Sequence, residues 1–192
     1  PAADGPVIQR ADERALAQGV DIFKVFELVR KIRNNVEVPM VFLLYYNVMV
    51  QYGIEKFFKC CQETGVDGLI IPDLPYEESD EIKEYTEKYG VYQISLVSPT
   101  SKDRIKNIAK DAKGFLYCIS SLGVTGEKSS FVTNFDEFVG TIKKYTDVPA
   151  CVGFGVSNGE QVKELTKYFD GAIVGSAIVK SIATGESVEE RI

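Results

Sequence analysis

The sequence predicts a parallel α/β protein and, within that class, a (β/α)8 barrel. Short, nearly continuous apolar runs alternate with amphipathic helical stretches six times along the 192 residues, which is typical of parallel strands covered on both faces. No G-x-G-x-x-G sequence follows the first apolar run, although a doubly wound nucleotide-binding sheet should carry one there. Glycine-rich loops follow the last strands, where barrels often bind phosphate. A doubly wound open sheet is the competing architecture.

The strand count predicts which part of a barrel the chain supplies. A barrel has eight strands and typically about 250 residues. We therefore expect the six visible strands to be numbers three to eight, with two further βα units before residue 1. No linker or compositional break interrupts the chain, so residues 1–192 are expected to belong to a single barrel domain. The predicted strands are 39–47, 67–73, 92–97, 114–120, 150–155 and 170–175.

The segments between these strands have helical periodicity. In the first long one, Ile22, Val25, Phe26, Leu28 and Val29 are predicted to form one apolar stripe. Most of the segments end at Gly, or at Asp shortly before Pro, as helices commonly do. The predicted helices are 22–34, 55–64, 76–90, 102–112, 135–146 and 159–169.

Composition excludes several classes of function. The net charge is −6 with no long basic run, which argues against nucleic acid and anionic membrane surfaces as partners. No apolar stretch approaches the roughly 18 residues that span a bilayer. The four cysteines have no metal-ligand spacing and predict packed thiols in a reduced cytosolic setting. Histidine is absent, which excludes Ser–His and Cys–His nucleophile pairs and His-ligated metals, so acid–base chemistry falls to Asp, Glu, Lys, Tyr or Cys.

Small residues at three loops predict a phosphate site. Gly155 stands at the end of one predicted strand, and Gly175 stands at the end of the next, where Ser176 leads into a short helix. The loop 120–130 offers Gly126 for the same oxyanions. Free backbone N–H groups and the positive end of a helix favour an anion, and glycine lets it approach. The alternative is that these glycines only make tight turns.

Six motifs together resemble one family, the alpha chain of tryptophan synthase. They follow the family's order from residue 1 to about residue 180, and they are PAADGPVIQRADERAL, FLLYYN, VDGLIIPDLPYEES, SSLGVTG, GFGVSNGEQV and GSAIVK. The resemblance implies a (β/α)8 barrel and a cytoplasmic lyase of tryptophan biosynthesis. Its retro-aldol reaction would cleave indole-3-glycerol phosphate to indole and glyceraldehyde 3-phosphate. The resemblance also implies that the alpha chain uses no metal or cofactor and joins a PLP-dependent beta chain in an alpha2-beta2 complex.

The resemblance assigns roles to individual residues. Two carboxylates suffice for the reaction, one moving protons and one binding the indole N–H. Asp4 matches the second of these, and the first, a Glu, is expected before residue 1. Tyr117, expected at the end of its strand, is the other catalytic candidate. The substrate-binding candidates are Leu43, Tyr45, Ile70, Leu96, Thr125 and Phe154, and the phosphate-binding candidates are Gly126, Gly155, Gly175 and Ser176.

Three further expectations concern the roles of Asp73 and Asp4, the contact with the beta chain, and the alternative functions. Asp73 in PDLPYEES is expected to help hold the site geometry rather than to bind a metal, and the spacing of Asp4 alone also fits a helix cap or an Asx turn. Contact with the beta chain is expected at the Asp4 loop, near Asn47 and near Pro75. The rival functions are another barrel enzyme for a phosphorylated metabolite, and a regulatory subunit that binds ligand without turnover. Release of indole on addition of substrate would exclude the regulatory subunit.

Overall fold

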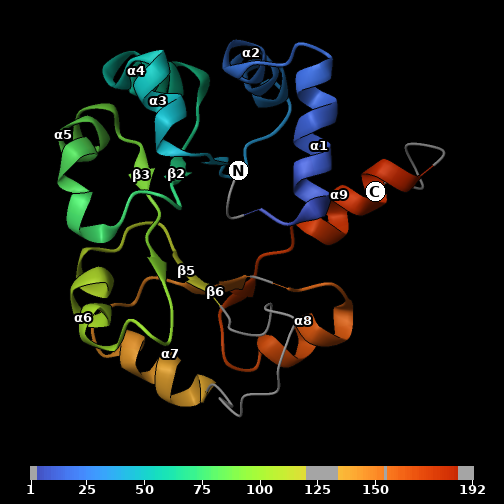
Figure 1. The fold of residues 1–192 in the computed structure, drawn as a ribbon. Coiled ribbons are helices and arrows are strands. Elements are labelled where there is room, and N and C mark those ends of the chain that lie inside the picture. The colour runs from blue at the N-terminus through green and yellow to red at the C-terminus, as the bar shows by residue number, and fades with distance from the viewer. Residues whose placement is uncertain (1–3, 120–133, 154, 186–192) are drawn as a thin grey trace. The chain divides into compact units, whose positions relative to one another are not determined.

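The computed structural model describes residues 4–119, 134–153 and 155–185 (Figure 1). The chain divides into two compact units, residues 1–94 and residues 95–192. Each unit contains one parallel sheet with helices between its strands. No helix within these ranges combines the length and the apolar character needed to cross a membrane.

The first unit is built on a three-stranded parallel sheet. Its strands lie in the order β1 (Val41–Leu43), β2 (Gly68–Ile70) and β3 (Tyr92–Gln93). The register pairs Val41 with Gly68 and Gly68 with Tyr92. The helices of this unit are α1 (Pro6–Ala17), α2 (Ile22–Arg33), α3 (Tyr46–Tyr52), α4 (Ile54–Thr64) and α5 (Asp80–Tyr89), with a 3-10 turn η1 (Tyr76–Glu78) before α5.

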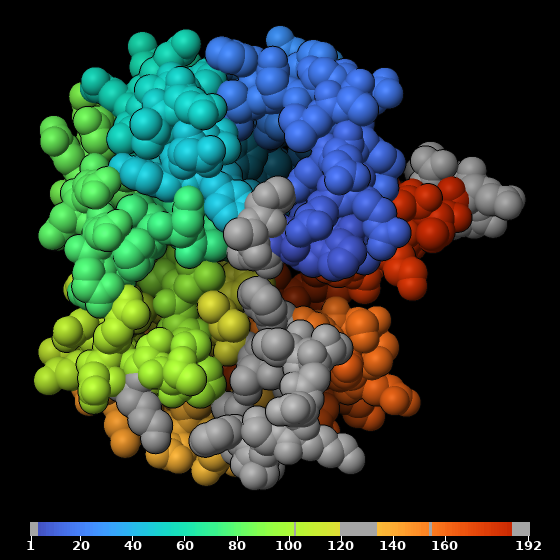
Figure 2. Space-filling view, in the orientation of Figure 1, coloured from blue at the N-terminus to red at the C-terminus, as the bar shows by residue number. Residues whose placement is uncertain are grey.

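Aromatic rings fill the core of the first unit. Phe26 of α2 meets Phe57 of α4 edge to face, with ring centroids 5.4 Å apart, and Phe57 meets Phe58 at 6.2 Å. All three side chains are at most 1% exposed, so they contribute large apolar areas to the core. The outer surfaces of α3, α4 and α5 form a continuous cyan-to-green layer in the space-filling view (Figure 2).

The predicted apolar stripe of α2 is correct except at Leu28. Phe26 and Val29 are buried, whereas Leu28 is 55% exposed. Leu28 lies two positions after Phe26, which is about 200° around the helix axis. Its side chain therefore leaves the helix on the opposite side from the core.

The second unit is built on a four-stranded parallel sheet. The strands lie in the order β4 (Leu96–Val97), β5 (Leu116–Ile119), β6 (Ala150–Gly153) and β7 (Gly171–Ala172). Leu116, Ile142 and Val152 are fully buried in its core. Its described helices are α6 (Lys102–Asp111), α7 (Phe135–Lys143), α8 (Gly159–Leu165) and α9 (Ser176–Thr184).

The strands are shorter than the apolar runs that predicted them. The run 39–47 contributes only β1 and already enters α3 at Tyr46. The run 92–97 forms two strands rather than one, because β3 pairs with β2 whereas β4 pairs with β5. The described residues therefore hold seven strands where six were predicted. An apolar run reports burial, and burial continues past the last ladder hydrogen bond.

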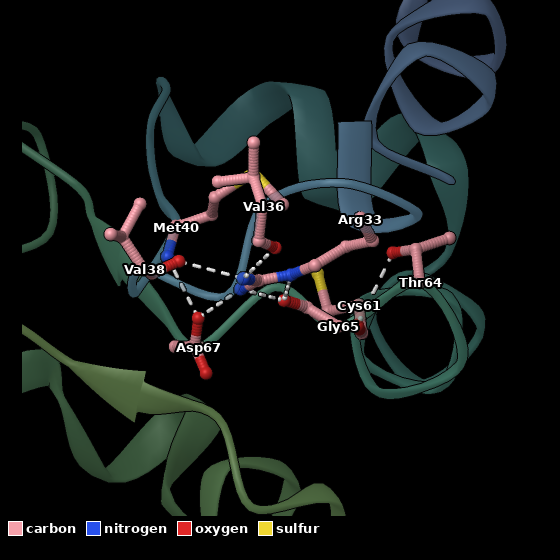
Figure 3. A network of polar contacts seen from close by, with 8 residues as sticks. All are labelled: Arg33, Val36, Val38, Met40, Cys61, Thr64, Gly65 and Asp67. Carbon is pink, nitrogen blue, oxygen red and sulfur yellow. Dashed lines mark hydrogen bonds and ion pairs between the residues drawn. The ribbon is translucent and has the colours of Figure 1, made fainter. Parts of the chain in front are cut away.

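A network centred on Arg33 fixes the amino ends of β1 and β2 (Figure 3). The Arg33 guanidinium donates to the Gly65 carbonyl from Nε (2.8 Å) and to the Val38 carbonyl from Nη1 (2.6 Å), and it pairs with the Asp67 carboxylate. Asp67 Oδ2 accepts the Met40 N–H (2.7 Å), while the Asp67 N–H donates to the Met40 carbonyl (2.8 Å). We call these five residues the first clamp.

The second unit repeats this arrangement with different residues. Lys143, the last residue of α7, pairs with Asp170 at 2.7 Å and donates to the Val148 carbonyl at 3.4 Å. Asp170 Oδ2 accepts the Ala150 N–H (2.7 Å), and the Asp170 N–H donates to the Ala150 carbonyl (2.9 Å). We call Lys143, Val148, Ala150 and Asp170 the second clamp. In both clamps the basic residue ends a helix, a Val-Pro pair leads into the next strand, and the Asp precedes the Gly that opens the following strand.

Candidate active site

Asp4 and Tyr45 meet in the first unit. The Tyr45 hydroxyl donates to Asp4 Oδ2 at 3.0 Å, across 41 positions of sequence. Tyr45 lies between the end of β1 at Leu43 and the start of α3, and both partners are partly buried. The structure therefore brings together a predicted catalytic residue and a predicted substrate-binding residue.

The Asp4 side chain is not a cap of the helix that follows it. Gly5 occupies the N-cap position of α1 without a side-chain hydrogen bond, and Pro6 opens the helix. The Gly5 carbonyl accepts the N–H groups of Ile8 and Gln9, each at 3.1 Å, and the Gln9 side chain donates to the Asp4 carbonyl at 2.8 Å. The turn is thus held by backbone groups and Gln9, which leaves the Asp4 carboxylate to Tyr45.

Asp73 lies next to this pair, in the loop after β2. Both of its carboxylate oxygens accept the Tyr46 N–H, at 2.9 and 3.1 Å. The Tyr46 hydroxyl donates to Glu81 of α5 at 2.7 Å. Burial, together with the hydrogen bond to Glu81, raises the pKa of Tyr46 to about 12.

Two predicted wall residues face each other in the sheet register. Leu43, the last residue of β1, pairs with Ile70, the last residue of β2. Ile70 is buried, whereas Leu43 is 53% exposed. Both stand at the carboxyl ends of parallel strands, the edge at which α/β proteins place their ligands.

Tyr117 lies nearer the start of its strand than predicted. It is the second residue of β5, in register with Leu96 of β4 and Cys151 of β6. Its buried ring still reaches the carboxyl end of the sheet, because a Cβ placed on Gly153 would lie 2.5 Å from Tyr117 Cζ. Burial raises the pKa of the Tyr117 hydroxyl, which favours its protonated, donating form.

The predicted phosphate residues that the structure describes stand after β6 and β7. Gly155 is exposed, with a left-handed φ of +76° that favours glycine. Gly175 is the N-cap of α9 and Ser176 is its first residue, and the first turn carries no acidic side chain. Such a helix end is suited to an anion. The other candidates, Thr125, Gly126 and Phe154, lie outside the described residues.

Sequence reasoning missed the long-range hydrogen bonds that join the parts of the site. The cap that Asp73 places on α3 joins residues 27 positions apart, and Glu81 holds Tyr46 across 35 positions. The available signal was the Asp that directly follows the apolar run of β2 and a proline, in PDLP. The two clamps had a sequence signal as well, since Val-Pro and Asp-Gly recur in the same order in both units.

Comparison with known proteins places this geometry in a family. A family model described as tryptophan synthase alpha chain matches residues 1–192. The chain belongs to the tryptophan synthase alpha chain family. The alpha chain of Thermoanaerobacter sp. (strain X514) is 48% identical over 192 residues, which are 100% of this chain and 73% of that relative. The alpha chain of Alkaliphilus metalliredigens is 49% identical over 185 residues, which are 96% of this chain and 70% of that relative.

Solved structures agree with the sequence relatives. Tryptophan synthase subunit alpha from Campylobacter jejuni matches with a TM-score of 0.89 and 42% identity, over 100% of this chain and 76% of that one. A chain of the tryptophan synthase complex from Pyrococcus furiosus matches with a TM-score of 0.82 and 32% identity, over 95% of this chain and 74% of that one. These matches confirm the predicted (β/α)8-barrel class in place of the doubly wound alternative, and they confirm the alpha-chain step of tryptophan biosynthesis, which is a lyase function.

Proposed function

We propose that the chain cleaves indole-3-glycerol phosphate to indole and glyceraldehyde 3-phosphate by retro-aldol chemistry, with Asp4 as the carboxylate that holds the indole N–H. The observation that carries this proposal is the bond from the Tyr45 hydroxyl to Asp4 Oδ2 at 3.0 Å. Because Asp4 does not cap α1, its carboxylate is oriented by a residue from the carboxyl end of β1 instead. A carboxylate held in this way supports a role in binding rather than in helix capping.

The reaction requires two things of the protein: groups that transfer protons, and a group that stabilises the charge on the indole nitrogen. The bond between indole C3 and the glycerol carbon breaks as C3 gains a proton and the hydroxyl on that carbon loses one, which leaves an aldehyde. Protonation of C3 places positive charge on the indole nitrogen, so a carboxylate at the N–H binds the transition state more tightly than the substrate. Asp4 takes this role. The proton transfers belong to a second carboxylate, a role that we assign to none of the 192 residues.

The remaining candidates divide between the two ends of the substrate. We assign Leu43, Ile70, Leu96 and Phe154 to apolar contacts with the indole. Tyr117 offers a hydroxyl that stays protonated, and we assign Thr125 to substrate binding. Gly155, Gly175 and Ser176, together with Gly126, receive the phosphate. The exposed amino end of α9 supports this division, because its free N–H groups suit the phosphate dianion.

The proposal includes a partner and a location. Because the solved relatives include a tryptophan synthase complex, we assign the chain a beta-chain partner in an alpha2-beta2 assembly. Tryptophan biosynthesis fits a cytoplasmic location.

The experiment that tests this function is indole release from indole-3-glycerol phosphate by the purified protein, with and without a beta chain. Formation of indole and glyceraldehyde 3-phosphate in equal amounts supports the proposal. Binding of the substrate that stimulates a beta chain without any indole release would assign the chain a regulatory role instead. Turnover of a different phosphorylated metabolite would identify another barrel enzyme.

A further inference from the structure

The geometry points to Asp73 as a positioning residue that fixes Tyr45 and, through Tyr45, the Asp4 carboxylate. The inference rests on the proposed function, because it assigns Asp73 a share in the indole-binding end of the site. Asp73 acts through the backbone of the residue after Tyr45, because both of its carboxylate oxygens accept the Tyr46 N–H.

The first step of the argument is the start of α3. Tyr45 occupies the N-cap position of this helix with extended dihedrals, φ −83° and ψ 147°, and its side chain makes no cap hydrogen bond. A helix start leaves its first N–H groups without partners inside the helix. Asp73 supplies the missing acceptor from the loop after β2, with both oxygens on the Tyr46 N–H. The cap of α3 is therefore supplied from a distant part of the sequence.

The second step is that Tyr45 is held on both sides. On its amino side the Leu44 N–H donates to the Ile70 carbonyl at 3.1 Å, and on its carboxyl side the Tyr46 N–H donates to Asp73. Both acceptors belong to β2 or to the loop that leaves it. The Tyr45 backbone is thus pinned against one neighbouring segment, and its side chain projects from two fixed points toward Asp4.

The third step is a second anchor on Tyr46. Its hydroxyl donates to Glu81 at 2.7 Å, so both the backbone and the side chain of this residue are tied to the segment that follows β2. Replacing Tyr46 by Phe removes the Glu81 bond and keeps the N–H that Asp73 accepts. This variant separates the contribution of the side chain from that of the backbone.

The matched control is Asp67. Its carboxylate also accepts a backbone N–H, that of Met40 at 2.7 Å, in the same unit but at the amino ends of β1 and β2. Asp67→Asn therefore weakens the same kind of interaction that Asp73→Asn weakens, but at the edge of the sheet away from Tyr45. If Asp73 matters only for stability, the two substitutions should have the same kinetic effect at equal loss of thermal stability.

The kinetic experiment compares Asp73→Asn, Asp73→Ala and Asp67→Asn in indole release. We expect Asp73→Ala to lower kcat about 3- to 10-fold with KM changed less than about twofold, and Asp73→Asn, which keeps one acceptor oxygen, to fall between this variant and the native protein. Asp67→Asn should leave kcat within about twofold. A Tyr45→Phe variant should make Asp73→Ala nearly silent, because the two residues act in series. Equal loss of kcat in Asp67→Asn, or effects that multiply in the double variant, would overturn the inference.

A measurement without substrate keeps this inference separate from the proposed function. Amide exchange at Tyr46 and the ring signals of Tyr45 can be followed by NMR in the full chain. We expect Asp73→Ala to speed exchange at Tyr46 and to shift the Tyr45 ring signals in the way that Asp4→Asn shifts them. If the native protein releases no indole but these changes occur, the reaction assignment falls and the positioning role stands. Unchanged Tyr45 signals in Asp73→Ala would refute the positioning role whatever the activity.

Discussion

Asp170 and Ala150 exchange two hydrogen bonds, one through the Asp170 carboxylate at 2.7 Å and one through its N–H at 2.9 Å. The carboxylate thus bonds the first residue of β6 where the ladder between β6 and β7 begins. Lys143 approaches the same oxygen at 2.7 Å and balances its charge. The pair gives partners to the backbone N–H and carbonyl of Ala150, a fully buried residue whose polar groups would be costly to leave unpaired.

Replacing Asp170 by Asn is expected to lower stability at neutral pH and to matter less in acid. The hydrogen bond from Lys143, and then the Ala150 N–H, hold the pKa of Asp170 below its usual 3.8. A carboxyl whose pKa is lower in the folded state stabilises the fold above the unfolded value, and this stability is lost as pH falls through the folded value. We expect a cost of about 1 kcal/mol at pH 7, because the group is nearly half exposed. Thermal melts of both proteins from pH 7 to pH 2 measure it, with Asp147→Asn as an exposed control, and a gap that stays constant down to pH 2 would contradict this account.

Arg33 should be hard to replace, even by lysine. Its guanidinium reaches the carbonyls of Gly65 and Val38 and pairs with Asp67, which a single ammonium cannot do at once. We expect Arg33→Met to lower the free energy of unfolding by about 2–3 kcal/mol and Arg33→Lys by about half as much. Urea unfolding followed by circular dichroism measures both. If Arg33→Lys matches the native protein, the fork geometry of the guanidinium contributes nothing here.

Asp4→Asn is expected to abolish most of the proposed activity while the fold is kept. The neutral amide cannot balance the positive charge that develops on the indole nitrogen, so we expect a loss of about 100-fold or more in kcat. Glu13→Gln removes an exposed carboxylate of α1 and should leave kcat unchanged. Indole release and thermal melts of the three proteins check this, and native turnover by Asp4→Asn would remove Asp4 from the mechanism.

Gly153→Ala tests the placement of Tyr117. The new Cβ would lie 2.5 Å from Tyr117 Cζ and 2.6 Å from Cε1, so the ring must move. We expect a loss of about 1–3 kcal/mol in stability and a fall in kcat. Gly140→Ala is the matched control, since a Cβ there meets nothing within 4 Å and Gly140 lies inside α7, where alanine is preferred by about 0.5–1 kcal/mol. Equal melting temperatures for Gly153→Ala and the native protein would show that the ring has room to move.

The sequence predicted the elements of the fold better than their ends. Periodicity located α2 and α4 to within a residue, because each helix buries one face on the core. It placed the end of the first strand four residues too late, since aromatic residues continue past β1 and the start of α3 depends on Asp73, 27 positions away from Tyr46. A bond between a carboxylate and a distant backbone N–H leaves no periodic signal in the sequence.

The residues of the site were likewise predicted better than the contacts between them. The family resemblance assigned Asp4 and Tyr45 to the site separately and predicted no bond between them, whereas the spacing of Asp4 alone favoured a helix cap or an Asx turn. In the structure Gly5, not Asp4, occupies the N-cap position of α1, and the Asp4 carboxylate accepts a hydrogen bond from the Tyr45 hydroxyl. Tyr117 was expected at the end of its strand but is the second residue of β5, and the length of the tyrosine side chain makes up the difference.

The two clamps also show how much room one βα unit leaves for insertion. Met40 and Asp67 are 27 positions apart, whereas their counterparts Ala150 and Asp170 are 20 apart, and both pairs make the same two hydrogen bonds. The difference is seven residues, which is the length of α3. The same two hydrogen bonds form at the amino edge in both cases. The longer βα segment therefore accommodates an additional helix at the opposite edge without losing either bond. A protein engineer could therefore lengthen the shorter βα segment, from Ala150 to Asp170, by one or two helical turns after β6. The pairing of β6 with β7 is expected to stay unchanged.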